Sequence, residues 1–312
     1  MTTTVRERTT VPAPLLVLAA IASVQVGSAI ARTLFDDLGA AGITLLRLFI
    51  AAVIVGVVVR PRVGGWSSAA WRAAVLLGVA MAGMNLLFYL ALRTVPLGVG
   101  VTVEFLGPLL LTLVQTRRLV DLLWALLAAG GVALLGLGSG FTVPVSGLLL
   151  AFSAGLCWAG YILASAHLGT LVPGTGGLAV ALAVGAVLVL PFGASGASAV
   201  LDHPSLLLGA VAVALLSSVL SYGLEINALR RMPTRVFGIL MSLEPAAAAV
   251  AGLVVLHQRL GLREVVALLL VSLASLGVTL AQRGPPVSQV SPVSPVSPAA
   301  PGSRDSPTLP AS

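Results

Sequence analysis

The sequence contains no lysine, only one cysteine and few charged residues of any kind. Charged residues make up 9% of the 312 positions, whereas soluble chains carry about a quarter. This shortage excludes a soluble domain of ordinary composition. The single cysteine, Cys157, excludes an internal disulfide and a cysteine-based metal cluster.

Sequence motifs for catalysis and for cofactor binding are also missing. The chain has no HExxH pattern, no Walker loop and no convincing nucleophile–base pair. Its three histidines, His167, His203 and His257, are scattered and lack the spacing of metal ligands. We therefore predict no enzymatic activity, no ATP-driven pumping, no cofactor and no metal.

Long apolar segments dominate what is present. The chain is 58% hydrophobic with a mean hydropathy of +1.09, and apolar runs of about 20 residues recur along it. The runs are continuous rather than alternating, which favours helices over a β-barrel. We predict an all-α membrane protein with ten transmembrane helices, at residues 12–31, 39–59, 72–92, 95–116, 119–137, 145–167, 178–192, 205–229, 234–257 and 261–282.

The basic residues are all arginines, and most lie at the ends of apolar runs. A net charge of +7 is compatible with nucleic-acid binding, but this placement fits the setting of membrane topology better. If the N-terminus is cytoplasmic, only Arg32, Arg93, Arg259 and Arg263 lie outside, and Arg47 lies within a span. We therefore predict a multi-pass protein of the cytoplasmic membrane with both termini in the cytoplasm and no nucleic-acid partner.

Two stretches of the chain repeat one another. Ala91-Leu92-Arg93 with Pro96 matches Ala228-Leu229-Arg230 with Pro233, and Pro108 matches Pro245 at the same offset. Because five spans per half is an odd number, the second half must enter the membrane in the opposite direction. This pattern predicts two inverted five-helix repeats around a central cavity, with a substrate site near the midplane.

The domain organisation follows from this repeat. We predict a cytoplasmic N-terminal segment at 1–11, a first repeat at 12–140, a second repeat at 141–283 and a tail at 284–312. The repeats would join in the charge-free loop around residues 139–145. The tail is rich in proline and serine, which predicts a disordered cytoplasmic segment; a proline-rich ligand is the alternative.

Four ionisable residues lie inside predicted spans: Arg47, Glu104, Glu225 and Glu244. Each costs roughly 2.5–3.5 kcal/mol at a helix centre, and such residues usually mark a substrate or ion path. The alternative is an Arg–Glu pair that only joins two helices. Arg47 suits either reading, since a guanidinium is a counter-ion for Glu104 or a ligand for a substrate carboxylate.

Pro108 and Pro245 each lie near the middle of a predicted span. Pro108 removes the N–H that would bond the carbonyl of Glu104, and Pro245 does the same to Met241. We predict helix breaks at Pro108 and Pro245, which a bilayer tolerates only against protein or water. A simple packing kink is the alternative.

Polar and aromatic side chains also share helix faces. Three- and four-residue spacings place both members of a pair on one face, where they line a cavity or form interhelical hydrogen bonds. The pairs are Asn85–Tyr89, Trp158–Tyr161, Tyr222–Glu225 and Gln25–Ser28.

These stretches resemble the threonine/homoserine exporter branch of the EamA family, within the drug/metabolite transporter superfamily. The resemblance covers about residues 15–282. It is carried by Met84–Leu90 of the sequence MNLLFYL, Thr94–Gly98, Glu104-Phe105 with Gly107-Pro108, Leu45-Arg47-Leu48, Arg117-Arg118 with Val120-Asp121, Trp158 with Tyr161, Leu224-Glu225, Pro233-Thr234-Arg235 and Met241–Pro245. His257-Gln258 stands where the family usually has Gly-Glu, so no role is transferred to that position.

The resemblance implies ten helices, cytoplasmic termini and export of small amino acids such as threonine and homoserine, coupled to proton entry. As partners we expect the amino-acid substrate, protons and the lipid bilayer, with a monomer or weak homodimer. In this hypothesis Arg47 meets the substrate carboxylate, and Glu104 and Glu244 are the proton-coupling candidates. The remaining substrate-binding candidates are Asn85, Tyr89, Trp158, Tyr161, Tyr222 and Glu225. Alternatives are export of another metabolite or drug, or a membrane-embedded interaction subunit or intramembrane enzyme without transport.

Overall fold

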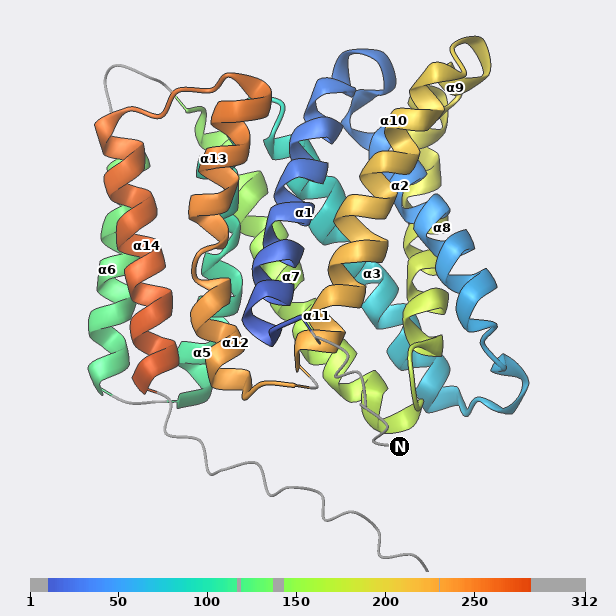
Figure 1. Ribbon diagram of the computed structural model, residues 1–312, viewed down its shortest axis with the longest axis horizontal. Helices are drawn as coiled ribbons and strands as arrows, with labels where there is room; N and C mark the ends of the chain where they lie inside the picture. The colour runs from blue at the N-terminus through green and yellow to red at the C-terminus, as the bar shows by residue number, and fades with distance from the viewer. Residues whose placement is uncertain (1–10, 117–118, 137–142, 230, 282–312) are drawn as a thin grey trace, which may run out of the picture. The chain divides into compact units, whose positions relative to one another are not determined.

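The computed structural model describes residues 11–116, 119–136, 143–229 and 231–281, and every regular element in these ranges is a helix (Figure 1). The predicted junction of the repeats lies mostly outside the described residues, as do the proline/serine-rich tail and nearly all of the segment 1–11. In chain order the α-helices are α1 (Ala13–Thr33), α2 (Phe35–Val59), α3 (Ser68–Ala91), α4 (Leu97–Glu104), α5 (Leu106–Thr116), α6 (Leu119–Gly136), α7 (Val145–Leu171), α8 (Gly176–Ala197), α9 (Ala199–Asp202), α10 (Ser205–Ala214), α11 (Ser221–Leu229), α12 (Thr234–Met241), α13 (Glu244–Leu256) and α14 (Leu262–Ala281). The 3₁₀ turn η1 (Val63–Gly65) and the π-helical stretch η2 (Leu215–Leu220) lie between them.

The helices have the length and composition of membrane spans. Within the described ranges, nine helical segments are long and apolar enough to cross a bilayer, counting α4–α5, α10–η2–α11 and α12–α13 as one segment each. The described apolar part of α6, Leu122–Leu135, is shorter. Large apolar side chains such as Val58 and Leu208 are about three-quarters exposed, at 77% and 75%. Water would not tolerate so many of them on one surface, so this is a multi-pass membrane protein.

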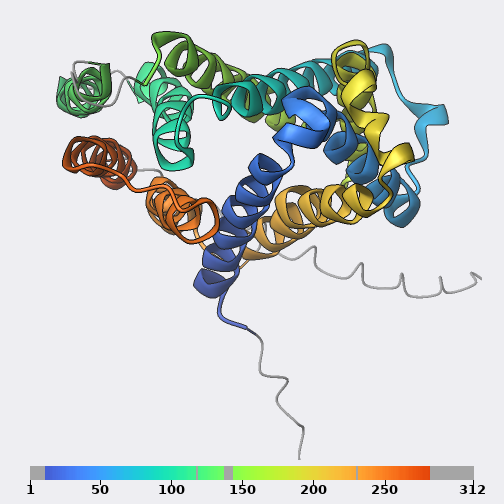
Figure 2. The same cartoon turned by 90° about the horizontal axis from the view of Figure 1, so that it is seen from above.

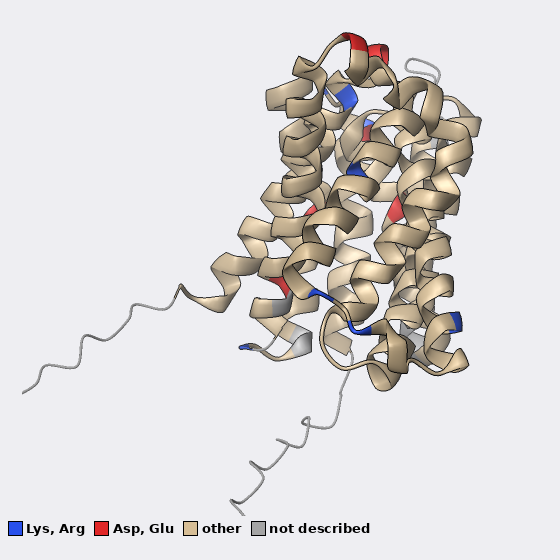
Figure 3. Ribbon diagram, turned by 90° about the vertical axis from the view of Figure 1, so that its right-hand side faces the viewer, with Lys and Arg blue, Asp and Glu red and all other residues tan. Residues whose placement is uncertain are grey.

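Successive spans run in opposite directions. In Figure 1 the chain ascends α1, descends α2 and ascends α3. Short connections join each of these helices to the next one along the chain. Charged positions lie at both ends of the helices, with a small number at mid-height (Figure 3). The helix α2 also contains Gly39, whose φ of 65° interrupts the helix at the position where the predicted span begins.

Four helix contacts build the body of the molecule. The most extensive are α2 against α8, α3 against α7 and α6 against α14, while α1 packs along α10, η2 and α11. Seen from above, α6 and α14 lie together at one edge and α1 lies near the middle (Figure 2). The helix α4 packs on α13, which brings the spans that contain Pro108 and Pro245 together.

The spans that contain Pro108 and Pro245 are both interrupted. The helix α4 ends at Glu104 and α5 begins at Leu106, while α12 ends at Met241 and α13 begins at Glu244. Each interruption comes just before a proline, Pro108 or Pro245, which has no N–H to donate to the preceding turn. Phe105 keeps helical angles, with φ −63° and ψ −16°, so the first interruption alters hydrogen bonding without turning the chain sharply.

At the first interruption the backbone touches a neighbouring helix. A Cβ atom on Gly107 would overlap the carbonyl group of Gly155, and one on Gly155 would overlap the carbonyl oxygen of Glu104. Glycine at both positions therefore allows α7 to approach the main chain at Glu104. This backbone contact fixes the position of Glu104 along the axis of its span relative to α7.

We expect Gly155→Ala to destabilise the protein, because the new methyl group would overlap the backbone of Glu104. Overpacking of this kind costs about 1–3 kcal/mol. Thermal unfolding of the purified protein measures the effect. The control is Gly130→Ala in α6, where a Cβ meets no atom within 4 Å and where alanine suits a helix better than glycine. Equal melting temperatures for the two variants would contradict the close approach.

The helix α13 ends just before His257-Gln258, the position that departs from the family pattern. His257 adopts the left-handed conformation, with a φ of 56°, which glycine adopts at no steric cost. The side-chain oxygen of Gln258 accepts a hydrogen bond of 2.9 Å from the backbone N–H of Leu97. That N–H belongs to the first turn of α4, where no intrahelical acceptor exists. Gln258 therefore ties α13 to the start of α4.

Candidate functional site

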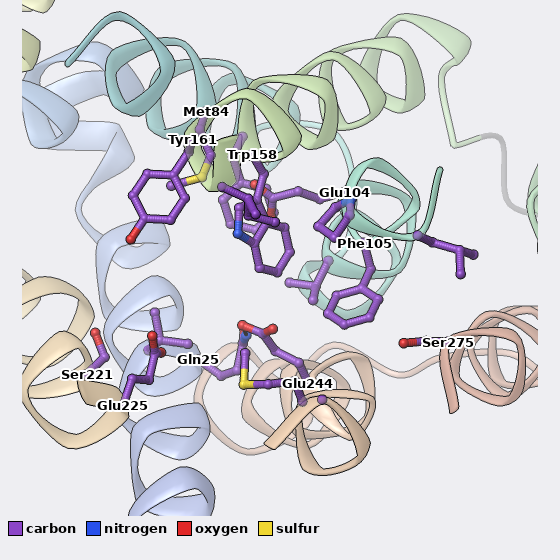
Figure 4. Close-up of a pocket in the computed structure, with 18 of the residues that line it drawn as sticks. Gln25, Met84, Glu104, Phe105, Trp158, Tyr161, Ser221, Glu225, Glu244 and Ser275 are labelled. Carbon is purple, nitrogen blue, oxygen red and sulfur yellow. Dashed lines mark hydrogen bonds between the residues drawn. The ribbon is translucent and has the colours of Figure 1, made fainter. Parts of the chain in front are cut away.

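A cavity of about 500 Å³ lies among the helices. Its lining comes from α1, α2, α3, the interrupted spans α4–α5 and α12–α13, α7, the η2–α11 segment and α14. Figure 4 shows side chains from both interrupted spans pointing into it. The cavity therefore lies where the two interrupted spans, α4–α5 and α12–α13, approach each other.

Arg47 of α2 supplies the positive charge of the cavity wall. Its side chain is 5% exposed, and it donates hydrogen bonds to the hydroxyl of Ser218 at 3.1 Å, the hydroxyl of Tyr89 at 2.9 Å and the carbonyl of Ser217 at 2.9 Å. Its guanidinium carbon also lies 5.5 Å from the centre of the Tyr89 ring. An arginine has five N–H donors, so these contacts fix the guanidinium and leave donors for a ligand.

The partners of Arg47 come from an unusual helical segment. Ser217 and Ser218 belong to the π-helical stretch η2, whose wider winding places both residues against α2. Single turns of π-helix are frequent at functional sites. Among the described residues, none offers Arg47 a carboxylate oxygen within 4.0 Å. The Arg–Glu pair considered as an alternative is therefore not formed in this structure.

Two carboxylates face the cavity from the interrupted spans. Glu104 lies at the end of α4 and Glu244 at the start of α13, and they are 8% and 7% exposed. Figure 4 shows them on opposite walls. The amide of Gln25 donates a hydrogen bond of 3.3 Å to Glu244, whereas the Glu104 carboxylate forms no hydrogen bond with any described residue.

Several buried polar atoms around the cavity have no hydrogen-bond partner within the described part of the chain. Four of them belong to lining residues: Gln25 Oε1, Ser217 Oγ, Ser221 Oγ and Glu244 Oε2. A buried polar atom left unpaired costs about 1–3 kcal/mol. Water or a polar ligand in the cavity would remove that cost, so the cavity suits a polar occupant.

Most of the residues singled out from the sequence meet at this cavity. The lining includes Arg47, Asn85, Glu104, Pro108, Trp158, Tyr161, Tyr222, Glu225 and Glu244. Tyr89 and Pro245 are not among the lining residues: Tyr89 is fully buried behind Arg47, and Pro245 lies within the first turn of α13. Asn85 donates a hydrogen bond of 2.7 Å to the carbonyl of Met81 in its own helix.

Other lining residues were not assigned from the sequence. The sequence pattern places Gln25 and Ser28 only on a polar helix face, and it gives Phe105 only as part of the family resemblance. It assigns no role to Ser217 or Ser221. The four-residue spacing of Ser217 and Ser221 in an apolar span was an available signal. Phe105 packs edge-on against Trp158, with ring centres 5.4 Å apart, which no sequence pattern indicates.

In the described ranges, His, Cys, Asp and Glu side chains form no group of three or more that could hold a metal ion.

Comparison with known proteins identifies the family. Residues 145–280 match the EamA-like transporter family. The chain is 41% identical to the threonine/homoserine exporter RhtA of Salmonella typhimurium (strain SL1344) over 279 residues, which covers 88% of this chain and 94% of that protein. It is also 41% identical to the threonine/homoserine exporter RhtA of Escherichia coli (strain K12) over 270 residues, covering 86% and 91%.

One solved crystal structure shares the fold. It superposes with a TM-score of 0.56 at 19% sequence identity and covers 86% of this chain and 96% of its own. At 19% sequence identity this similarity is evidence for a shared fold alone. The identity to the RhtA exporters extends over nearly the whole chain, and on that ground the protein is a member of the EamA-like transporter family.

Proposed function

We propose that this protein exports small neutral amino acids such as threonine and homoserine across the inner membrane. The relatives that are 41% identical over most of the chain are named threonine/homoserine exporters. The observation that carries the proposal is the cavity, which combines a fixed guanidinium with two buried carboxylates.

The charges of the cavity suit a zwitterion. Arg47 is held by hydrogen bonds to Tyr89, Ser218 and Ser217, so little of its freedom remains to be lost on binding a carboxylate. Glu104 and Glu244 offer acceptors for an ammonium group, and one of them also carries the proton that is exchanged. The unpaired oxygens of Ser217 and Ser221 suit a substrate hydroxyl.

The architecture that we propose is ten spans in two inverted repeats. We count α4–α5, α10–η2–α11 and α12–α13 as single spans, which makes α7 the sixth span and the counterpart of α1. The packing of α3 on α7 in the structure then corresponds to the packing of α10–η2–α11 on α1. The packing of α4–α5 on α7 corresponds in the same way to the packing of α12–α13 on α1. The second span, α2, packs on its own counterpart, α8. This exchange of contacts is what an inverted repeat produces, with the substrate site at the interface of the halves.

Transport would proceed by alternating access with proton antiport. Each half carries an interrupted span whose carboxylate faces the cavity, Glu104 in the first and Glu244 in the second. Protonation of these groups from the outside and release of the proton inside would couple proton entry to substrate exit. The excess of arginine at the predicted cytoplasmic side supports cytoplasmic termini.

A second candidate is export of an aromatic or apolar compound. Phe88, Phe105, Trp158 and Phe237 also line the cavity and would stack on such a cargo. The unpaired polar atoms weigh against it, because an apolar occupant leaves them unpaired.

Counterflow in proteoliposomes separates the two candidates. Vesicles containing only the purified protein are loaded with unlabelled threonine, and uptake of labelled threonine, homoserine, valine or a cationic dye is followed with and without a pH gradient. We expect exchange of threonine and homoserine, faster than valine, with net movement driven by the gradient. Exchange of the dye but not of threonine would favour the second candidate. No exchange of any compound would contradict the proposal that this chain transports by itself.

A further inference from the structure

A second hollow lies on the outer surface of the helices, apart from the transport cavity. It is an apolar groove of about 550 Å³ formed by α2, α3 and α8, and it shares no lining residue with the cavity. The small residues Ala52, Gly56, Ala179 and Ala183 leave room between bulkier neighbours such as Leu188. Because the groove lies on apolar, outward-facing helices, its surroundings in the cell are lipid chains.

Basic residues gather at one end of this groove. Pro61 and Trp71 line that end, where α2 passes into α3. The residues on either side of Pro61 are Arg60 and Arg62, and the residue after Trp71 is Arg72. All three arginines are exposed, and none of their guanidinium groups donates a hydrogen bond to a described residue. The chain from 60 to 72 contains no acidic residue, so their charge is uncompensated locally.

The backbone at Arg60 is strained. Arg60 ends α2 in the left-handed conformation, with a φ of 47° and a ψ of 63°. This conformation is sterically unfavourable for a non-glycine residue, and helices usually place glycine there. Residues held in such conformations cluster at functional sites, and here the strained position carries a guanidinium beside the groove.

The groove end also has the aromatic residues of a membrane boundary. The rings of Trp66 and Trp71 pack in a tilted arrangement, with an interplanar angle of 56° and ring centres 5.4 Å apart, and Trp71 is 40% exposed. Tryptophan at this level is typical of the layer of lipid headgroups. The apolar groove therefore runs into the bilayer from a point where headgroup phosphates lie.

We infer that this groove binds an anionic phospholipid of the surrounding bilayer. The acyl chain occupies the groove between α2, α3 and α8, and the phosphate lies among Arg60, Arg62 and Arg72, here called the arginine cluster. Basic residues near a membrane surface attract anionic lipid headgroups. A neutral lipid would fill the groove equally well but would leave the arginine cluster without a partner.

Thermal unfolding of the full-length protein in detergent, with added phosphatidylglycerol or phosphatidylcholine, tests the inference. We expect phosphatidylglycerol to raise Tm and phosphatidylcholine to raise it less. The variant Arg60→Gln/Arg62→Gln/Arg72→Gln should lose the difference between the two lipids. The control variant Arg93→Gln/Arg259→Gln/Arg263→Gln removes the same charge from the opposite end of the helices and should keep it.

A groove-filling variant tests the acyl-chain contact separately. A Cβ atom on Gly56 would meet no atom of a neighbouring helix within 4 Å, so we expect Gly56→Leu to place its side chain in the groove. We expect it to bind phosphatidylglycerol more weakly, as seen by native mass spectrometry, while its Tm without lipid is unchanged. Equal stabilisation by the two lipids, equal effects of the two triple variants, or unaltered lipid binding by Gly56→Leu would each overturn the inference.

Discussion

The variant Glu104→Gln is expected to lose export driven by a pH gradient, with its rate falling to that measured without a gradient. The glutamine keeps the size of the side chain but binds no proton, and Glu104 faces the cavity without a hydrogen bond to any described residue. Proteoliposomes loaded with threonine, with acidic buffer outside, measure the rate. Counterflow of labelled threonine at equal pH, which needs no net proton movement, should persist.

The matched control is Glu264→Gln. Glu264 lies in the first turn of α14 and does not line the cavity, so this variant should respond to the gradient as the unaltered protein does. Gradient-driven export that survives in Glu104→Gln would remove Glu104 from the coupling mechanism. Loss of counterflow as well, in a protein with unchanged Tm, would assign Glu104 to substrate binding rather than to proton transfer.

The variant Arg47→Lys is expected to weaken substrate binding severely although it keeps the positive charge. Lysine lacks the planar fork that reaches Tyr89, Ser218 and Ser217 at once. Hydrogen bonds of charged groups contribute about 1.5–3 kcal/mol each, and about 1.4 kcal/mol is a tenfold change in affinity. We therefore expect at least a tenfold higher half-saturating threonine concentration in counterflow.

The variant Tyr89→Phe provides the comparison for Arg47→Lys. It removes only the hydroxyl that accepts from Arg47 and keeps the ring beside the guanidinium. Its half-saturating concentration should rise less than that of Arg47→Lys, because the contacts with Ser217 and Ser218 remain. A near-normal value for Arg47→Lys would show that charge alone matters and that the fixed guanidinium geometry does not.

Much of the helical arrangement could be predicted from local pattern. The predicted span at 205–229 coincides with the segment α10–η2–α11, and the span at 95–116 coincides with α4 and α5 together. Hydropathy is read over windows of about 20 residues, the length that a bilayer requires. The same reading could not reveal that the span at 205–229 contains a π-helical stretch, since apolar periodicity does not distinguish α from π winding over six residues.

The candidate site was predicted less evenly. Ionisable side chains in apolar runs stand out in any sequence, so Arg47, Glu104, Glu225 and Glu244 were selected and all line the cavity. Tyr89 was selected as a ligand of the substrate, but the structure places it behind Arg47, fully buried. The distinction depends on which side of α3 meets α2, and a four-residue spacing alone does not determine that.

The amino-acid sequence is enough to establish that this chain spans a membrane, where its spans lie, and which few charged residues lie inside them at an energetic cost. Composition and hydropathy are sufficient for that, because the bilayer acts on each segment separately. The partners of the buried polar groups come from the folded arrangement instead. Arg47 donates to Ser217 and Ser218, 170 and 171 positions further along the chain, and Gln25 donates to Glu244, 219 positions further along. Such partners are selected by helix packing, which depends on all the spans at once.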